Sequence, residues 1–447
     1  MTLYSLCKRR TFLQQILIFS LAVLTGIAMF SGISYADITE TAKLVPEDGA
    51  YNDLFGSSVS ISGDYAIVGA PNDDEGTIVN SGCAYIFERT KGIWSEKAKL
   101  LAPDRSRDDI FGSSVSISGD YAIVGKPFDD HTGSNYGSAY IFHRTEPVPG
   151  TIIWGQMAKL VASDGGANDY FGSSVAISGD FAIVGAPFND DNGSDSGSSY
   201  IFQRSGSTWS QVEKLLPAEV TIGDLFGYSV AINGDDAVVG APRDDNERGT
   251  TAGSIYIFQR SDGTWSGWRL IDPNGAAEDE FGWSVSIDGH FAIAGAHYYD
   301  GGTELANSGS ARIFEEIEDT GIWGTLSYHR LIPSDTAASD EFGFSVSISS
   351  ECAVIGTLKY INGNGTVYVF RKSTDDNNWP QLEKLIASDG SPWGFGSAVS
   401  ISGPYVIVGA KWDINSAGSA YVYDIFAGPS PPHSGTMPAI PLLLLDD

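Results

Sequence analysis

Positive charge is scarce in this chain of 447 residues. It has 26 Lys and Arg residues against 56 Asp and Glu residues, which gives a net charge of −30. Binding to nucleic acid requires a basic surface that neutralises phosphates, and binding to anionic lipid has the same requirement. The composition therefore argues against a nucleic-acid partner and against adhesion to an anionic membrane surface.

Cysteine is also scarce, with only three residues. Three cysteines cannot form a disulfide framework or a zinc site built from cysteines. Cys83 and Cys352 are the two that follow the N-terminal segment, and they are far apart in the sequence. We interpret both as small buried thiols, because a disulfide between them is not expected.

Long apolar runs are missing except near the N-terminus. There, the basic residues 8–10 precede an apolar stretch at 16–33, and the small residues Ser34 and Ala36 follow it. This order is typical of a secretory signal peptide, here cleaved after Ala36. A membrane anchor is the alternative, which the polar residues within the stretch and the cleavage site disfavour. No later segment approaches the roughly 20 apolar residues that a spanning helix needs.

The signal peptide predicts a secreted, periplasmic or cell-surface protein with no membrane span after cleavage. The general secretory route is the favoured route of export. The segment 9–13, Arg-Arg-Thr-Phe-Leu, also resembles the twin-arginine motif, so that route stays open as the alternative.

Glycine, in contrast, is abundant, with 53 residues, and the aromatic content is 12%. Many glycines in an aromatic-rich chain indicate tight turns between short strands. A Phe-Gly pair recurs at intervals of 53 to 61 residues, and its phenylalanines are Phe55, Phe111, Phe171, Phe226, Phe281, Phe342 and Phe395. Each pair opens the same string, which in the first copy reads FGSSVSISGDYAIVGAP, a polar loop, GCAYIFERT and WSEKAKLL.

Each copy contains four short runs with strand composition. In the first copy they lie near Ser58–Ile61, Tyr65–Gly69, Ala84–Glu88 and Trp94–Leu101. Four strands in units of this length fit the blade of a β-propeller. We therefore predict an all-β fold, a β-propeller of seven four-stranded antiparallel blades, with each repeated Phe as a wedge between neighbouring blades.

The ends of the repeat region predict how the ring closes. A Lys-Leu or Arg-Leu pair marks the fourth strand of each unit, but the first such pair precedes the first Phe-Gly and none follows the last unit. The segment Thr41–Val45 should therefore supply the outer strand of the last blade. The expected domains are a signal peptide at 1–36, the propeller at 37–426, and a Pro-rich linker with a short apolar tail at 427–447.

Phe-Gly followed by Gly-Ala-Pro resembles the FG-GAP repeats that build the seven-bladed propeller at the head of integrin α chains. The short Ser-Gly-Asp turn is most similar to the bacterial branch of these repeats. The resemblance implies a binding or adhesion role and a monomeric propeller. In integrin-type repeats, a calcium loop lies between strands one and two. Here that connection is only residues 62–64, too short to wrap a cation with six to eight oxygens.

The loops between strands two and three are acidic, and they should share one face with the loops between strand four and the next strand one. The candidate residues for a binding face are Asp74, Asp130, Asp190, Asp245 and Asp300, together with His297, Tyr298 and Tyr299 of the fifth unit. The functional interpretation is a surface for divalent cations or a cationic partner. The structural interpretation is solvated turns capped by Asp side chains.

One of these loops offers a calcium candidate. Asp190, Asn192 and Ser194 present oxygens at alternate positions, but there is no Gly at the sixth position and no acid at the twelfth. We expect no resident cofactor, and calcium is the one ion that the acidic loops suggest.

The sequence shows no catalytic constellation. Its six His residues do not recur at a fixed repeat position, and no Gly-x-Ser-x-Gly motif is present. The favoured function is a non-enzymatic module that binds an extracellular protein or a surface glycan. Two alternatives remain: a hydrolase or lyase that acts on polysaccharide through loop carboxylates, and a structural protein that takes up calcium.

Comparison of the repeats with one another predicts ion pairs on the opposite face. An acidic residue begins strand two and a basic residue stands two positions after the Phe of strand three, so the two should meet across the hairpin. The predicted pairs are Asp64–Arg89, Asp120–Arg144, Asp180–Arg204, Asp235–Arg260 and Glu351–Lys372. We interpret them as architectural and not as a ligand site.

Overall fold

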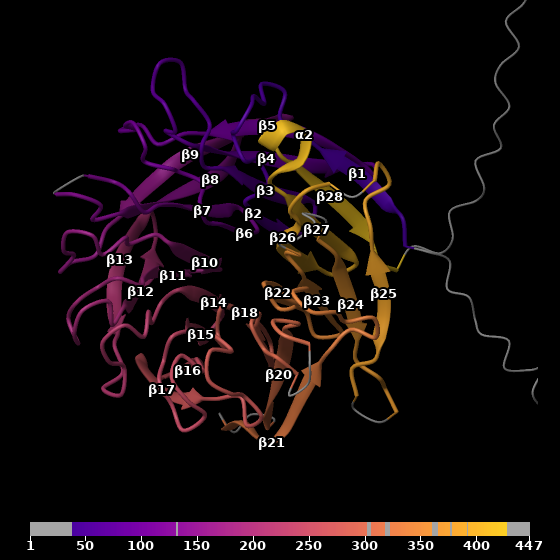
Figure 1. The fold of residues 1–447 in the computed structure, drawn as a ribbon. Coiled ribbons are helices and arrows are strands. Elements are labelled where there is room, and N and C mark those ends of the chain that lie inside the picture. The colour runs from indigo at the N-terminus through magenta and orange to yellow at the C-terminus, as the bar shows by residue number, and fades with distance from the viewer. Residues whose placement is uncertain are drawn as a thin grey trace, which may run out of the picture. The chain divides into compact units, whose positions relative to one another are not determined.

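The computed structural model describes residues 38–426, except 131–132, 302–304, 318–321, 360–364, 376–377 and 391. The predicted signal peptide and the C-terminal tail lie outside the described residues. The described residues form seven four-stranded antiparallel sheets arranged as the blades of a propeller (Figure 1). The predicted fold class is thus confirmed.

The blades follow one another along the chain, and in each the inner strand comes first. Blade 1 contains β2 (Ser58–Ser62), β3 (Tyr65–Ala70), β4 (Cys83–Thr90) and β5 (Ile93–Leu100). Blade 2 contains β6 (Val115–Ser118), β7 (Tyr121–Lys126), β8 (Ser138–Val148) and β9 (Thr151–Leu160). Blade 3 contains β10 (Ser174–Ser178), β11 (Phe181–Ala186), β12 (Ser198–Ser205) and β13 (Thr208–Leu215). Blade 4 contains β14 (Ser229–Asn233), β15 (Asp236–Ala241), β16 (Ser254–Ser261) and β17 (Thr264–Leu270).

The last three blades keep this order, and the seventh takes its outer strand from the N-terminal segment. Blade 5 contains β18 (Ser284–Asp288), β19 (Phe291–Ala296), β20 (Ser310–Ile317) and β21 (Ile322–Leu331). Blade 6 contains β22 (Ser345–Ile348), β23 (Cys352–Gly356), β24 (Val367–Arg371) and β25 (Gln381–Leu385). Blade 7 contains β26 (Phe395–Ser402), β27 (Tyr405–Ala410), β28 (Ser419–Asp424) and β1 (Glu40–Leu44), with the short turn α2 (Asp413–Ser416) before β28.

Strand β1 lies antiparallel to β28, and Lys43 faces Tyr421 in the register. The hydroxyl of Thr41 also donates to the carbonyl of Val422 at 3.0 Å. The N-terminal segment and the last repeat therefore share one sheet, although they are separated by most of the chain.

The serines of the inner strands join neighbouring blades. The Ser58 hydroxyl donates to the carbonyl of Gly112 in blade 2 at 2.8 Å. The Ser60 hydroxyl accepts from the backbone N–H of Ile117 at 3.1 Å. A small side chain with both a donor and an acceptor can bridge two closely spaced strands in this way. The Ser-Val-Ser-Ile pattern thus places Ser against the next blade and Val and Ile in the core.

The glycines of the repeated motif make the closest contact between blades. A Cβ added to Gly69 would lie 2.0 Å from the carbonyl oxygen of Gly112, which follows the Phe of the next blade. Gly112 itself has a φ of +93°, and a Cβ there would lie 2.1 Å from the Cys83 carbonyl. The Gly of Gly-Ala-Pro in one blade and the Gly of Phe-Gly in the next are therefore required together, because their backbones touch.

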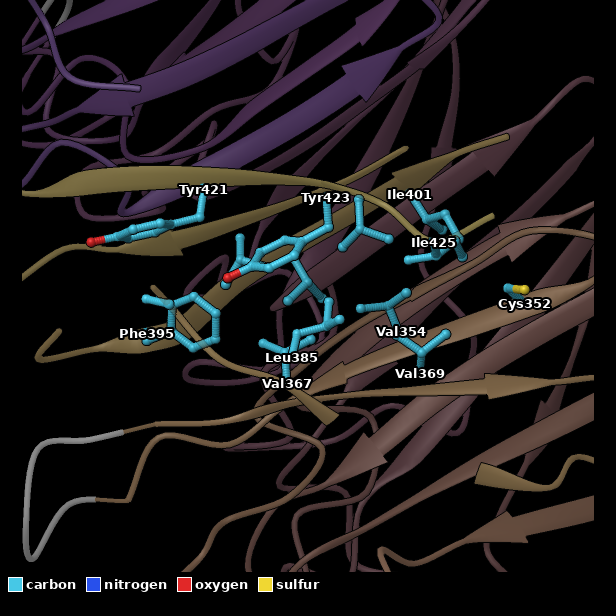
Figure 2. Packing of buried hydrophobic residues seen from close by; sticks show 14 of the residues in the cluster. Cys352, Val354, Val367, Val369, Leu385, Phe395, Ile401, Tyr421, Tyr423 and Ile425 are labelled. Atoms are coloured by element: carbon cyan, nitrogen blue, oxygen red, sulfur yellow. The ribbon is translucent and has the colours of Figure 1, made fainter. Parts of the chain in front are cut away.

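The hydrophobic core lies between the blades, as seven clusters that each draw on two neighbouring blades. In the cluster between blades 6 and 7, Phe395 and Tyr423 pack against Leu385 and Val367 of the preceding blade (Figure 2). Phe395 is 1% exposed, and its ring meets Tyr421 edge-to-face with centroids 5.6 Å apart. The predicted role of the repeated Phe as a wedge between blades is confirmed.

Cys83 and Cys352 are both buried free thiols, in agreement with the prediction. Burial raises the pKa of Cys352 to about 11, so its thiol stays protonated at neutral pH.

Candidate binding face

The loops between strands two and three share one face with the loops that connect each blade to the next. The exposed aspartates proposed for this face each hold their own loop closed. The Asp74 carboxylate accepts from the backbone N–H of Asn80 at 2.8 Å. The same contact recurs in four further loops, where Asp130, Asp190, Asp245 and Asp300 accept from Asn135, Asp195, Thr251 and Asn307. These carboxylates cap turns, and their outer lone pairs face solvent.

In blades 1, 2 and 4 the residue before this aspartate is also Asp, and it is buried and belongs to an internal network. The Asp73 side chain is 4% exposed, and one of its oxygens lies 3.1 Å from the Lys99 ammonium. Lys99 also binds Asp48 of the connecting loop at 2.7 Å, and the Tyr85 hydroxyl donates to the same Asp48 at 2.7 Å. Comparable pairs in other blades join Lys159 to Asp129, Arg269 to Asp244 and Lys43 to Asp413. Part of the acidity of this face is thus neutralised from within.

In six of the seven copies, an aspartate stands two residues before the repeated Phe, and it is also buried. Asp53 accepts from the backbone N–H of Ala50 at 2.6 Å, which closes the turn that leads into the inner strand. Burial and the nearby carboxylate of Asp73 raise the pKa of Asp53 to about 6. Burial likewise raises the pKa of Asp279 to about 6. These residues shape the face and do not present charge to a partner.

Blade 2 carries a lysine where blade 1 has Ala70. Lys126 is fully buried, and its ammonium lies 2.8 Å from Asp109 and 3.2 Å from Asp129. A buried ammonium is stable there because two carboxylates and the carbonyl of Asp104 surround it. The sequence shows this only as Gly-Lys-Pro in place of Gly-Ala-Pro.

Two of the three side chains in the calcium candidate loop already have partners within the protein. The Asn192 side-chain amide donates to the carbonyl of Val220 in the next connecting loop, and Asp190 caps the turn at Asp195. Across the described residues, no group of three or more His, Cys, Asp or Glu side chains is arranged to hold a metal ion. Calcium binding by Asp190, Asn192 and Ser194 stays a prediction.

The proposed residues of blade 5 divide into buried and exposed ones. His297 is 1% exposed, and burial lowers its pKa to about 3, so the imidazole is neutral. Tyr299 is also buried, with the Arg330 guanidinium 4.1 Å from the ring centroid. Of the aromatic candidates, Tyr298 reaches solvent at 37% exposure, and the neighbouring Asp300 is also exposed. The prediction that His297 and Tyr299 are surface binding residues is wrong, because both side chains are buried beneath the face.

His297 packs against a cluster of aromatic residues that was not predicted from the sequence. Its ring lies 4.2 Å from that of Trp283, which in turn lies 4.6 Å from Tyr228 and 5.8 Å from Phe344. These three aromatic residues stand two positions after the repeated Phe in blades 4, 5 and 6. At this position the other blades have Ser57, Ser113, Ser173 and Ser397. The signal was therefore present in the repeat alignment.

Blade 7 contributes a groove on the same face. It encloses about 540 Å³ and is lined by Tyr51, Asp389, Pro392, Trp393, Trp412, Asp413, Ile414, Asn415 and Ser416. Tyr51 is 80% exposed and Trp393 is 62% exposed. Trp393 occupies the position that is Asp in the other six copies, and the loss of that capping residue was the sequence signal for this groove.

The ion pairs lie at the other end of the blades. Arg89 contacts Asp64, Arg144 contacts Asp120, Arg204 contacts Asp180, and Arg260 lies 2.6 Å from Asp235. Blade 6 differs from the prediction. Glu351 binds Arg371 at 3.2 Å, whereas Lys372 binds Glu315 of blade 5 at 3.0 Å. The Glu351–Lys372 pair is thus replaced, because the lysine side chain crosses to the preceding blade.

The same cations also stack on aromatic rings of the preceding blade. Arg144 lies 5.0 Å from the ring centroid of Tyr65, and Lys372 lies 4.2 Å from that of Phe291. Three further junctions show the same contact, with Arg89 on Tyr405, Arg204 on Tyr121 and Arg260 on Phe181. This end of the blades is therefore occupied by contacts within the ring, in line with the architectural role assigned to these cations.

A ring of seven repeats joined by Phe-Gly and Gly-Ala-Pro contacts defines a class of protein, the repeat-built β-propeller. Seven segments match the model of the FG-GAP repeat, at 38–87, 94–142, 154–202, 209–258, 268–314, 327–370 and 379–423. This chain belongs to the FG-GAP repeat family.

Curated relatives cover part of the chain. Integrin alpha-6 of Gallus gallus is 39% identical over 92 residues, which is 18% of this chain and 9% of the relative. Integrin alpha-6 of Homo sapiens is 34% identical over 114 residues, which is 22% of this chain and 10% of the relative. The matched region thus spans about a tenth of the length of these relatives.

Among solved structures, that of Sqt1 from Saccharomyces cerevisiae aligns with a TM-score of 0.46 and 11% identity, over 88% of this chain and 87% of the other. Separately, none of the helices in the described part of the chain has the length and apolar character required to span a membrane.

Proposed function

We propose that this protein is a non-enzymatic extracellular module of adhesion type, which binds a protein or a glycan through the face that carries the two sets of acidic loops. The observation that carries the proposal is the departure of blades 4–7 from the repeat on this face. Large aromatic residues, Tyr228, Trp283, Phe344 and Trp393, stand there in positions that are Ser or Asp in the other blades.

Aromatic residues favour recognition because they bury a large area at low cost in conformational entropy. The space between neighbouring blades cannot take this role, because the inner strands contact each other through Ser hydroxyls and glycine backbones. The opposite end of the blades is filled by ion pairs and cation–π contacts. The aromatic side of the loop face is thus the surface left for a partner. The similarity to integrin alpha-6 supports an extracellular role.

The test uses the mature chain on arrays of extracellular proteins and glycans. Two variants restore the repeat on the loop face, Trp283→Ser and Trp393→Asp. A matched control, Pro404→Asp, restores the repeat at the opposite end. We expect at least one array signal that falls with a loop-face variant and persists in the control. Turnover of a polysaccharide, abolished by a single loop Asp variant, would contradict the non-enzymatic assignment.

A further inference from the structure

We propose that the blade 7 groove is a binding site for a neutral pyranose chain. This inference rests on the proposed function, since it names the ligand class for one part of the loop face. It follows from three features of the groove: its open aromatic rings, the state of its carboxylates, and the absence of cations along its described lining.

The first feature is the support of the two tryptophans. The backbone N–H of Trp412 donates to the carbonyl of Trp393 at 3.2 Å, which links the two loops. Trp412 lies over Gly394, where an added Cβ would meet its ring at 3.0 Å. Only glycine allows the indole to rest on the backbone in this way. The Lys411 ammonium, 4.8 Å from the ring centroid, holds Trp412 further. Trp393 is left exposed beside a fixed partner.

The second feature is the difference in hydrogen bonding and exposure between the carboxylates of Asp413 and Asp389. Asp413 is used by the protein, because it accepts from Lys43 at 2.8 Å, Ser419 at 2.7 Å and the backbone N–H of Ile414 at 2.9 Å. Asp389 is held by Lys43 at 2.6 Å, but its side chain is 43% exposed. The Tyr421 hydroxyl also donates to Asp389 at 3.2 Å, so this carboxylate is a fixed acceptor that is still accessible from the groove, which suits hydroxyl donors.

The third feature is charge. Among the described residues, the lining contains two aspartates and no Lys, Arg or His, and the one ammonium that reaches these aspartates, that of Lys43, is paired with both. A polyanionic ligand would find no unpaired cation among these lining residues and would be repelled by the net charge of the whole chain. A neutral ligand avoids this cost and can use the carboxylate of Asp389 and the amide of Asn415.

A pyranose chain combines what these features require. The axial C–H bonds of an equatorially substituted sugar form an apolar face, which can cover Trp393 and Tyr51, and its ring edge carries hydroxyls for Asp389 and Asn415. A volume of about 540 Å³ lies in the range of small-molecule sites. A Pro-rich peptide also docks on aromatic grooves, but it offers no hydroxyl donors for Asp389. The sugar is therefore the ligand that uses both kinds of group.

The experiment measures binding by titration calorimetry with four probes: cellohexaose, hexa-N-acetylchitohexaose, hexagalacturonate and a Pro-rich peptide. We expect at least one neutral hexasaccharide to bind the mature chain, and hexagalacturonate not to bind. Trp393→Ala should weaken the association by about tenfold or more, as loss of a central aromatic contact does, whereas Trp393→Phe should retain most of it. Phe426→Ala is the matched control, because Phe426 is an exposed aromatic residue that follows the opposite end of blade 7.

The inference is overturned if neither neutral hexasaccharide binds at millimolar concentration, or if Trp393→Ala binds as well as the native chain. Binding of the peptide alone would also overturn it. In each of these cases the wider proposal survives if the arrays give a signal that Trp283→Ser removes, so the two failures are distinct.

Discussion

The guanidinium of Arg89, at the end of β4 in blade 1, stacks on the ring of Tyr405 at the start of β27 in blade 7, with Cζ 3.8 Å from the ring centroid. The junction between the last and first blades thus has the same cation–π contact as four junctions inside the chain. The two remaining junctions lack both partners, since they pair Asp236 with Glu316 and Cys352 with Ile425. At this repeat position the cation occurs only where the preceding blade supplies the ring, whereas Arg371 of blade 6 lies 4.8 Å from the ring centroid of Phe426, which follows blade 7.

This relationship predicts a measurable coupling between Arg89 and Tyr405. In a double-mutant cycle with Arg89→Met and Tyr405→Leu, we expect a coupling free energy of about 1 kcal/mol from chemical denaturation. Asp64→Asn should cost less, about 0.5 kcal/mol or below, because the Asp64 side chain is 58% exposed and its ion pair is screened by water. A coupling indistinguishable from zero would show that the stacking does not stabilise this junction.

Most of the architecture could be predicted from the alignment of the seven repeats with one another. Seven Phe-Gly pairs predicted seven blades, and the shared end of strands two and three predicted which acid faces which cation in blades 1–4. Both inferences concern partners within one unit, where the separation along the chain fixes the geometry.

Contacts between units were harder to predict. The stacking of Arg144 on Tyr65 depends on how two neighbouring blades are oriented. The spacing of residues within one repeat unit gives no information on that orientation. For the same reason His297 looked like a surface residue until the packing with Trp283 was known. Trp393 was not predicted, because the pattern was defined by the Asp that recurs in six copies and not by the residue that replaces it in the seventh.

The contact between Gly69 and Gly112 predicts a strong effect from one methyl group. Gly69→Ala would place a Cβ 2.0 Å from the Gly112 carbonyl oxygen. Since the neighbouring backbone is fixed by the next blade, we expect a loss of about 3 kcal/mol in unfolding free energy, or failure to fold. Gly155→Ala is the control, because a Cβ there meets nothing within 4 Å and should be neutral or slightly stabilising. Equal stability of the two variants would contradict the contact.

The buried Lys126 predicts a pH-dependent variant. Lys126→Met keeps the apolar stem but removes the ammonium between Asp109 and Asp129, so we expect a loss of about 3 kcal/mol near neutral pH. Burial already raises the pKa of Asp109, and loss of the cation raises it further. Because Asp109 can then accept a proton, the loss should be smaller near pH 5. Denaturation of native and variant chains at both pH values tests this, and an equal loss at both would contradict it.

The stability of the native chain should rise on mild acidification. Burial is the largest cause that raises the pKa values of Asp53, Asp236, Asp244 and Asp279 to about 6, above their value in the unfolded chain. At these four groups the folded state binds more protons than the unfolded state between about pH 4 and pH 6, so their contribution to stability falls as pH rises through this window. His297 and His329 act in the opposite direction, because burial lowers their pKa values, but they are two groups against four.

We therefore expect a higher melting temperature near pH 5 than near pH 7.5. Relief of charge repulsion acts in the same direction, so both scans are run in high salt to screen it. Asp53→Asn keeps the acceptor for the Ala50 N–H but cannot titrate, and it should reduce the difference between the two melting temperatures. An unchanged difference in this variant would assign the effect to other groups.

Removal of the N-terminal strand tests the seventh blade as a whole. Deletion of residues 38–46 would leave β28 as an unpaired edge and would take the Lys43 ammonium from Asp389 and Asp413. We expect aggregation or a large fall in melting temperature, because an exposed edge strand invites pairing with another chain. Lys43→Met keeps the strand and removes only the charge, so it should cost less than the deletion and should raise the pKa of Asp413, which is now held low. A truncated chain that melts like the native one would show that β1 does not stabilise the blade.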